Sequence, residues 1–230
     1  MKNYVVIGAS QGIGNEIALQ LSSSNQVFGT YNTYQKENVE NISFQHYNVL
    51  ENKLDSILFP EIIDGLVYCP GSISLKPFNR FNEDDFINDY KLNVIGAAKI
   101  IQHLFPNLKK SASPSIVLFS SVAVQTGMPF HSLVASSKGA IEGLTKSLAA
   151  EFAPSIRVNC IAPSLTETCL ANFLINSEVK KTNAALRHPL KKIGQVKDIA
   201  SMAVFLLQEN SQWITGQIIK IDGGLSTLKI

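Results

Sequence analysis

The chain has 230 residues, of which 17% are charged, and its formal net charge is +2. This sparse, balanced charge contains no basic run that would favour nucleic-acid binding, and no apolar run reaches the roughly 18–20 residues of a membrane span. The three cysteines are dispersed, which argues against a disulfide framework and against a metal site, and we expect a cytoplasmic protein.

Short apolar runs alternate with longer amphipathic ones along the chain. They predict strands over residues 4–7, 26–30, 42–47, 65–68, 115–120, 156–161 and 217–221. They predict helices over residues 12–22, 53–58, 83–93 running on to 105, 136–152 and 196–207. This alternation is typical of a single α/β domain over residues 1–230, with a Rossmann-like doubly wound parallel sheet of about seven strands.

A long segment late in the chain shows no clear pattern. Residues 165–189 are polar and lie between two well-patterned elements. Loops of this length are uncommon in compact domains and often cover an active site. We therefore expect a lid here, and the apolar side chains of Leu170, Phe173, Leu174 and Ile175 suggest a partly apolar small-molecule substrate.

A glycine-rich turn follows the first strand and opens the first helix. Glycine is needed here because the chain turns sharply, approaches a pyrophosphate closely and packs a helix on a strand. The N-terminus of the helix then offers free N–H groups to the phosphates. The turn predicts a dinucleotide-binding site made by Gly8, Ser10, Gln11, Gly12, Ile13 and Gly14.

The spacing of these glycines resembles that of the short-chain dehydrogenase/reductase family, and the resemblance covers nearly the whole chain. It extends to residues 157–163, to residues 188–200 and to the Gly223-Gly224 pair. The branch most similar to the chain is that of the acyl-carrier-protein ketoreductases. The resemblance implies that the cofactor is also contacted by Asn32, Asn48, Val49, Gly71, Lys138, Pro163 and Thr166.

The end of the second strand bears on the choice of nicotinamide cofactor. Members that prefer NAD carry a carboxylate there, bonded to the ribose hydroxyls, whereas this chain has Tyr31. No acid repels a 2′-phosphate, although Gln11 stands where some NADP-dependent members have arginine. We expect NADP(H) in preference to NAD(H).

Three of the family's four catalytic positions match. Ser121, Lys138 and Asn93 stand where the family has its substrate-binding serine, its lysine and its helix asparagine. The proton-donating tyrosine, four residues before the lysine and thirteen after the serine, is replaced by Val134. A valine has no proton to give, so the resemblance implies cofactor binding more directly than it implies turnover.

His131 is the candidate substitute for the missing donor. It lies seven residues before Lys138, which is the tyrosine-to-lysine spacing of the family's enoyl-reductase branch. Histidine titrates near neutral pH and suits proton transfer, whereas the alternative is a loop histidine without a role. The nearby hydroxyls of Ser132, Ser136 and Ser137 are weak acids, and we expect them to cap the start of the helix.

These motifs lead to one main functional hypothesis and two alternatives. The main one is an NAD(P)(H)-dependent oxidoreductase that reduces a carbonyl or an activated alkene, or catalyses the reverse oxidation. The alternatives are a catalytically silent nucleotide-binding subunit or sensor, and a non-redox isomerase or dehydratase. The family resemblance also implies a homodimer or homotetramer, and we expect neither nucleic-acid nor membrane partners.

Overall fold

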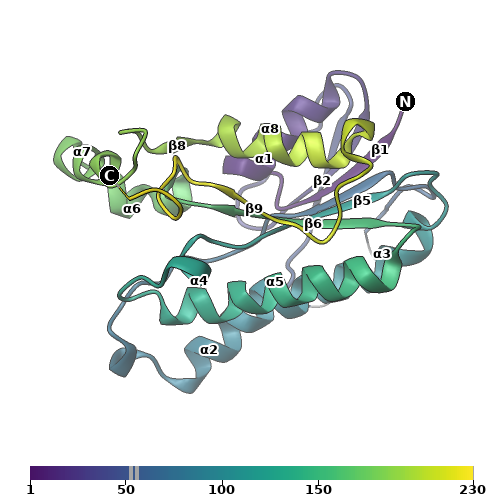
Figure 1. Ribbon diagram of the computed structural model, residues 1–230. Helices are drawn as coiled ribbons and strands as arrows, with labels where there is room; N and C mark the ends of the chain where they lie inside the picture. The colour runs from purple at the N-terminus through teal and green to yellow at the C-terminus, as the bar shows by residue number, and fades with distance from the viewer. Residues whose placement is uncertain (52–53, 55–56, 230) are drawn as a thin grey trace.

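The computed structural model describes residues 1–51, 54 and 57–229, and its centre is a parallel sheet (Figure 1). In this part of the chain seven strands pair in the order β3-β2-β1-β4-β5-β6-β9. The strands are β1 (Asn3–Ile7), β2 (Gln26–Tyr31), β3 (Ile42–His46), β4 (Gly65–Tyr68), β5 (Ser115–Phe119), β6 (Arg157–Pro163) and β9 (Ile218–Ile221). The predicted doubly wound sheet of seven strands is confirmed.

The strand order reverses beside β1. The chain runs outward from β1 through β2 to β3, then returns to place β4 on the other side of β1. Val5 is therefore paired with Phe28 of β2 on one side and with Leu66 of β4 on the other. In such sheets ligands bind beyond the carboxyl ends of the strands at this reversal, so the topology fixes where a site is expected.

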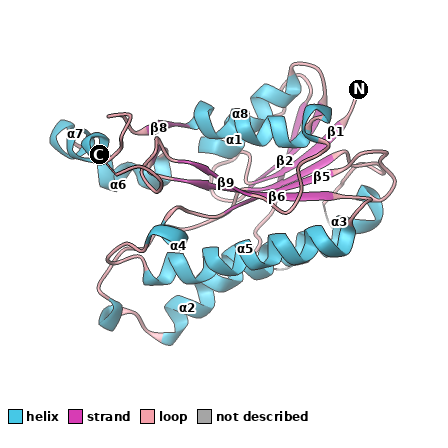
Figure 2. Cartoon of the chain, in the orientation of Figure 1, coloured by secondary structure: helices cyan, strands magenta, loops and turns pink. Residues whose placement is uncertain are grey.

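Helices cover both faces of the sheet (Figures 1 and 2). One face carries α1 (Gly12–Ser22) and α8 (Val196–Leu207), whereas the other carries α3 (Gly96–Leu108) and α5 (Ser132–Phe152). Each layer has its own apolar core, with Ile17 and Leu206 in the first and Ile100 and Ile141 in the second. None of the described helices is both long and apolar enough to cross a membrane.

The helices differ from their predicted positions in three places. The helix expected over residues 83–105 is divided into α2 (Glu83–Tyr90), a π-helical turn over Lys91–Ile95, and α3. The expected helix over 53–58 falls on residues 53, 55 and 56, which lie outside the described part of the chain. The long helix α5 begins at Ser132, four residues before its expected start at residue 136.

The early start of α5 makes the predicted serine caps wrong. The N-cap position is His131, which makes no side-chain cap bond. Ser136 lies inside the helix and donates its hydroxyl to the carbonyl of Leu133 at 2.8 Å, while Ser137 points to Asp89. The serines were expected at the cap because their side chains bond readily to local backbone, but here they bond within the helix or across to another one.

The segment 165–189, which we call the lid segment, was expected as a loop and is largely folded. It contains β7 (Thr166–Glu167), a 3₁₀ turn over Cys169–Ala171, α6 (Asn172–Ile175) and α7 (Glu178–Leu186). Strand β7 pairs with β8 (Gly194–Gln195), and a small core forms around Ile175. Hydroxyl caps start two of these short pieces, which explains why a polar sequence is ordered here.

Candidate active site

A cavity of about 1080 Å³ lies at the strand-order reversal and extends under the lid segment. Most of the residues expected from the sequence contribute to its lining. They are Gly8, Ser10, Gln11, Gly12, Ile13, Gly14, Asn32, Val49, Gly71, Ser121, His131, Lys138, Pro163 and Thr166. The structure thus brings the expected phosphate-binding turn and three of the four expected catalytic residues into one space, whereas Asn93 is not part of the lining.

The glycine-rich turn has the geometry that a pyrophosphate requires. Gly8 and Gly12 have positive φ values of 79° and 54°, which favour glycine. A Cβ atom on Gly14 would lie 2.2 Å from the carbonyl oxygen of Gly8, so only glycine lets α1 pack this closely on the turn. Gln11 precedes α1 without a side-chain cap, which leaves the first N–H groups of the helix free for an anion.

The part of the cavity beside β2 carries polar and aromatic side chains, and no acid among the residues that the structure describes. Tyr31, Asn32, Thr33 and Tyr34 line it where β2 ends. Asn48, expected near the adenine, lies outside the lining. Its side chain accepts the Leu50 N–H at 3.0 Å and donates to Glu51 at 2.9 Å, and therefore stabilises its own turn.

Lys138 and Asn93 meet around Gly71. A Cβ atom on Gly71 would lie 3.3 Å from Asn93 Oδ1 and 3.4 Å from Lys138 Nζ. Asn93 lies in the π-helical turn, and its Nδ2 donates to the carbonyl of Asp89 at 2.9 Å. Its buried Oδ1 has no hydrogen-bond partner among the residues described, so an acceptor is left available beside the lysine for a ligand or a water.

The Lys138 ammonium lies in a desolvated position. Burial lowers the pKa of Lys138, and nearby Cys160, Asp89 and Cys69 oppose that shift. Burial raises the pKa of both Cys69 and Cys160 to about 12, so both are neutral thiols near pH 7. A desolvated cation at the wall of a cavity attracts the hydroxyls or phosphates of a ligand more strongly than an exposed one.

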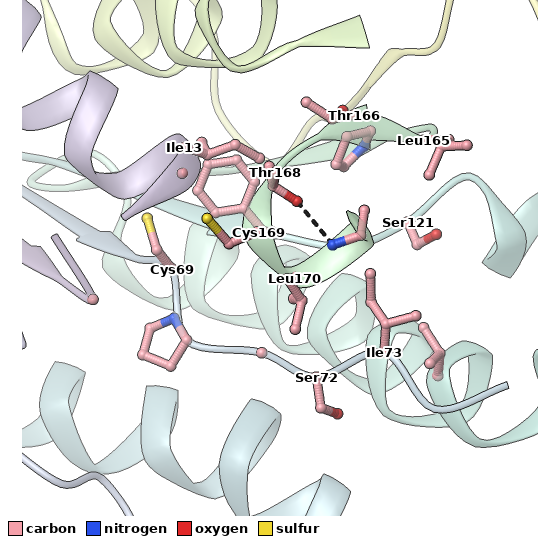
Figure 3. Close-up of a pocket in the computed structure, with 18 of the residues that line it drawn as sticks. Ile13, Cys69, Ser72, Ile73, Ser121, Leu165, Thr166, Thr168, Cys169 and Leu170 are labelled. Atoms are coloured by element: carbon pink, nitrogen blue, oxygen red, sulfur yellow. Dashed lines mark hydrogen bonds between the residues drawn. The ribbon is translucent and has the colours of Figure 1, made fainter. Parts of the chain in front are cut away.

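The two neighbouring serines after β5 have different environments. The Ser120 hydroxyl is buried and donates to Glu142 Oε1 at 2.7 Å. The Ser121 hydroxyl accepts the Ala123 N–H at 3.2 Å, which leaves its own hydrogen free to donate. Both serines line the pocket of Figure 3, in which Ser121 is labelled, but the Ser120 hydroxyl hydrogen is already donated to Glu142. Ser121 is therefore better placed than Ser120 to donate to a ligand.

Val134 and His131 both reach the cavity. The Val134 side chain is 7% exposed and lines the wall one helical turn before Lys138. His131 lines the same cavity, and its Nδ1 lies 2.8 Å from the carbonyl oxygen of Pro129. Because a carbonyl can only accept, Nδ1 carries a hydrogen, and Nε2 is the nitrogen left to exchange a proton.

Thr168, a second threonine of the lid segment, lies beside the glycine-rich turn, whereas from the sequence only Thr166 was expected at the cofactor. A Cβ atom on Gly12 would lie 3.5 Å from the methyl group of Thr168. The Thr168 hydroxyl accepts the Ala171 N–H at 3.2 Å (Figure 3). The Thr166 hydroxyl instead donates to the Ser164 carbonyl at 3.0 Å. The Thr-x-Thr pattern of residues 166–168 could have indicated both threonines, but only the path of the backbone shows that Thr168 is the one beside Gly12.

The lid segment gives its end of the cavity a positive and apolar lining. Leu170, Phe173 and Leu174 supply apolar side chains, while Ile175 belongs to the core of the segment itself. Among the described residues that line the cavity, the charged side chains of fixed sign are Lys138, Lys180 and Arg187, with no aspartate or glutamate.

Comparison with known proteins identifies the family. The family model described as enoyl-(acyl carrier protein) reductase matches residues 57–226. A tropinone reductase homolog of Arabidopsis thaliana is 30% identical over 97% of this chain and 92% of its own length. A short-chain dehydrogenase family protein of Francisella tularensis has a TM-score of 0.90 at 30% identity, covering 99% of this chain and 100% of its own. The structure of ElxO with NADP bound has a TM-score of 0.87 at 28% identity, covering 99% of both chains. The chain belongs to the short-chain dehydrogenase/reductase family.

Proposed function

We propose that the chain is an NADP(H)-dependent oxidoreductase that reduces a carbonyl or an activated alkene in a small molecule, or catalyses the reverse oxidation. The observation that carries this proposal is that Ser121, His131 and Lys138 line the same cavity as the glycine-rich turn. When bound, the nicotinamide cofactor supplies or accepts the hydride. We also infer a cytoplasmic protein that forms a homodimer or homotetramer.

The residues present fit a dinucleotide. The free N–H groups at the start of α1 suit a pyrophosphate, and Lys138 suits the ribose hydroxyls beside the nicotinamide. NADP(H) is favoured over NAD(H) because none of the described residues that line the cavity where β2 ends is an acid, so none of them repels a 2′-phosphate. Asn32 and Thr33 offer donors there, and the NADP bound to ElxO is consistent with the same choice.

We assign the donation of a proton to the substrate to His131. Its Nδ1–H donates to the Pro129 carbonyl and holds the ring. In the imidazolium form Nε2 also carries a hydrogen, which it gives to the substrate, and the ring is left as the neutral Nδ1–H tautomer. The free hydroxyl of Ser121 donates to the substrate oxygen and orients it. Lys138 holds the cofactor rather than replacing the tyrosine, since a lysine engaged with the ribose is poorly placed to protonate the substrate.

The lining of the lid segment suggests the substrate class. Lys180 and Arg187 lie at this end of the cavity, where the described part of the chain contributes no carboxylate to the lining. The Lys180 ammonium donates to Asn176 at 2.9 Å, whereas the Arg187 guanidinium has no polar partner among the described residues. An anionic group on the substrate would satisfy Arg187, and an apolar body would lie against Leu170 and Phe173.

Val134 supports a second candidate, a nucleotide-binding subunit or sensor without turnover. Its buried methyl groups place no proton where the family has one. A non-redox isomerase or dehydratase on the same scaffold would also dispense with the tyrosine. Both alternatives retain the dinucleotide site, so binding alone does not separate them from a reductase.

The decisive experiment combines binding with turnover. NADPH and NADH are titrated against the purified protein by cofactor fluorescence, and absorbance at the nicotinamide band is then followed with a panel of ketones and enoyl thioesters. The proposal expects tighter binding of NADPH and oxidation of NADPH by at least one class of substrate. Binding without oxidation by any member of the panel would favour the silent subunit or the non-redox enzyme instead.

A further inference from the structure

Asp89 is a buried acid that the proposed chemistry does not use. It lies on α2 with an exposed fraction of 6%, one helical turn before Asn93. Burying a carboxylate is costly unless hydrogen bonds and a nearby cation compensate for the lost hydration. The groups around Asp89 must therefore compensate for its burial, and they indicate its role.

The Asp89 side chain joins three segments of the active site. One carboxylate oxygen accepts the hydroxyl of Ser72, which directly follows Gly71, and the other accepts the hydroxyl of Ser137 at 2.5 Å. Ser137 directly precedes Lys138 on α5. The backbone carbonyl of Asp89 accepts the Asn93 amide at 2.9 Å. One residue thus contacts the Gly71 turn, the π-helical turn and the helix that carries the lysine.

Asp89 also contributes negative charge near Lys138. The groups that act on the lysine are Cys160 on β6, Cys69 after β4 and Asp89 on α2. Burial keeps both thiols protonated and therefore neutral near pH 7. Of these three groups, Asp89 is the one that brings a negative charge. The attraction of Asp89 raises the pKa of Lys138, whereas desolvation lowers it.

We propose that Asp89 is a positioning residue of the active site. Through Ser72 and Ser137 its carboxylate fixes Gly71 and Lys138 against Asn93, and its charge keeps Lys138 in the ammonium form that holds the cofactor ribose. The step from the lysine to the cofactor rests on the proposed function, whereas the effect of Asp89 on the charge of Lys138 does not.

The test compares Asp89→Asn with Asp84→Asn, which makes the same charge change at an exposed position of the same helix. The NADPH dissociation constant is measured from pH 6 to pH 10, and kcat is measured with any substrate that the panel identifies. For Asp89→Asn we expect the alkaline loss of NADPH binding to move about one pH unit lower. We also expect kcat to fall about tenfold, with little change in affinity at pH 6. Asp84→Asn should match the unsubstituted protein. Superimposable pH profiles for Asp89→Asn and the unsubstituted protein would overturn the proposal.

Two further measurements keep the proposal testable if Asp89→Asn does not fold or if the protein shows no turnover. Ser137→Ala keeps the carboxylate but removes one tether, so it should lower kcat about threefold to tenfold without moving the pH profile; an unchanged kcat would contradict the positioning role. Without any cofactor, the titration of Lys138 is followed by NMR of carbon-13-labelled lysine, with its signal assigned by its loss in Lys138→Met. A lower titration midpoint in Asp89→Asn supports the charge effect, and an unchanged midpoint refutes it, whether or not the protein is a reductase.

Discussion

Val134 and Lys138 lie one turn apart on α5, and both side chains line the same cavity. This is the i, i+4 relationship that would let a phenol at position 134 meet the lysine ammonium. Lys138 and Ser121 line that cavity, and Asn93 lies beside the lysine at Gly71. Under the proposed function, a tyrosine at position 134 would therefore add a proton donor to a site whose other residues are already in place.

Val134→Tyr should therefore restore a proton donor. A general acid contributes about 10²–10⁴ to a rate, and we expect reduction of simple ketones to rise at least about tenfold, allowing for imperfect placement of the ring. The rate of NADPH oxidation with a ketone panel measures the effect. Val134→Phe is the matched control, because it adds the same ring without the hydroxyl. An equal gain in the phenylalanine variant would mean that the ring, and not its proton, caused the increase.

His131→Ala should abolish most of the turnover of the unsubstituted chain. We expect kcat to fall by about 10²–10⁴, because the side chain that presents Nε2 to the cavity is removed. Affinity for NADPH should stay within about twofold, since the glycine-rich turn and Lys138 hold the cofactor. His103→Ala serves as the control, because His103 is exposed on α3 and does not line the cavity. Undiminished turnover in His131→Ala would remove the histidine from the mechanism.

Lys138→Met should stabilise the protein and weaken its binding of NADPH. Burial lowers the pKa of Lys138 in spite of the opposing attraction of Asp89. The ammonium therefore costs folding stability in full below that lowered pKa, and the cost disappears only at the ordinary pKa of lysine. Methionine fills similar space without the charge. We expect the unfolding midpoint at pH 7 to rise by about 2–4 °C. The difference in midpoint between the variant and the unsubstituted protein should narrow as pH rises, because Lys138 then loses its proton in the unsubstituted protein. NADPH affinity should fall about 10–100-fold, as for a lost charged hydrogen bond.

Differential scanning fluorimetry and fluorescence titration measure both effects on the same samples. Lys146→Met is the matched control, since Lys146 is exposed on the same helix and does not line the cavity. Neither its midpoint nor its NADPH affinity should change appreciably. A Lys138→Met variant that is less stable than the unsubstituted protein at pH 7 would contradict the inferred cost of burying the ammonium.

The fold and the cofactor end of the site could be predicted from the sequence because their constraints are local. Gly8, Gly12 and Gly14 stand within seven residues. A positive φ favours glycine at the first two positions, and the close approach to the Gly8 carbonyl requires it at the third. The buried strands likewise appear as short apolar runs between amphipathic segments. These signals need no knowledge of distant contacts.

The Asp89 cluster could not be predicted, because Ser72, Asp89 and Ser137 are far apart in the sequence and meet only in the folded chain. The one local hint is an acid at i−4 to Asn93, on the buried side of a helix. The start of α5 was missed for a related reason. Serines favour helix caps in general, but the partner of Ser137 lies on another helix.

Gly14→Ala should weaken cofactor binding and destabilise the fold. Its new methyl group would lie 2.2 Å from the Gly8 carbonyl oxygen, so α1 or the turn must move. Overpacking of this kind costs about 1–3 kcal/mol, and the displaced turn should bind NADPH at least about tenfold more weakly. Gly143→Ala is the matched control, because a Cβ there would meet nothing within 4 Å and alanine favours a helix. Chemical denaturation and NADPH titration should separate the two variants, and equal behaviour would rule out the close approach.

Arg187→Gln should discriminate between substrates by their charge. Arg187 is an exposed residue at the lid end of the cavity, so solvent screening limits its effect. We therefore expect KM for a 3-oxo carboxylate to rise only about threefold to tenfold, while KM for its methyl ester stays unchanged. Arg80→Gln removes the same charge from an exposed position outside the cavity and should affect neither substrate. If KM for the acid and KM for the ester change equally in Arg187→Gln, the arginine affects the lid segment but does not bind the charged group of the substrate. The proposal of an anionic substrate would then have to be abandoned.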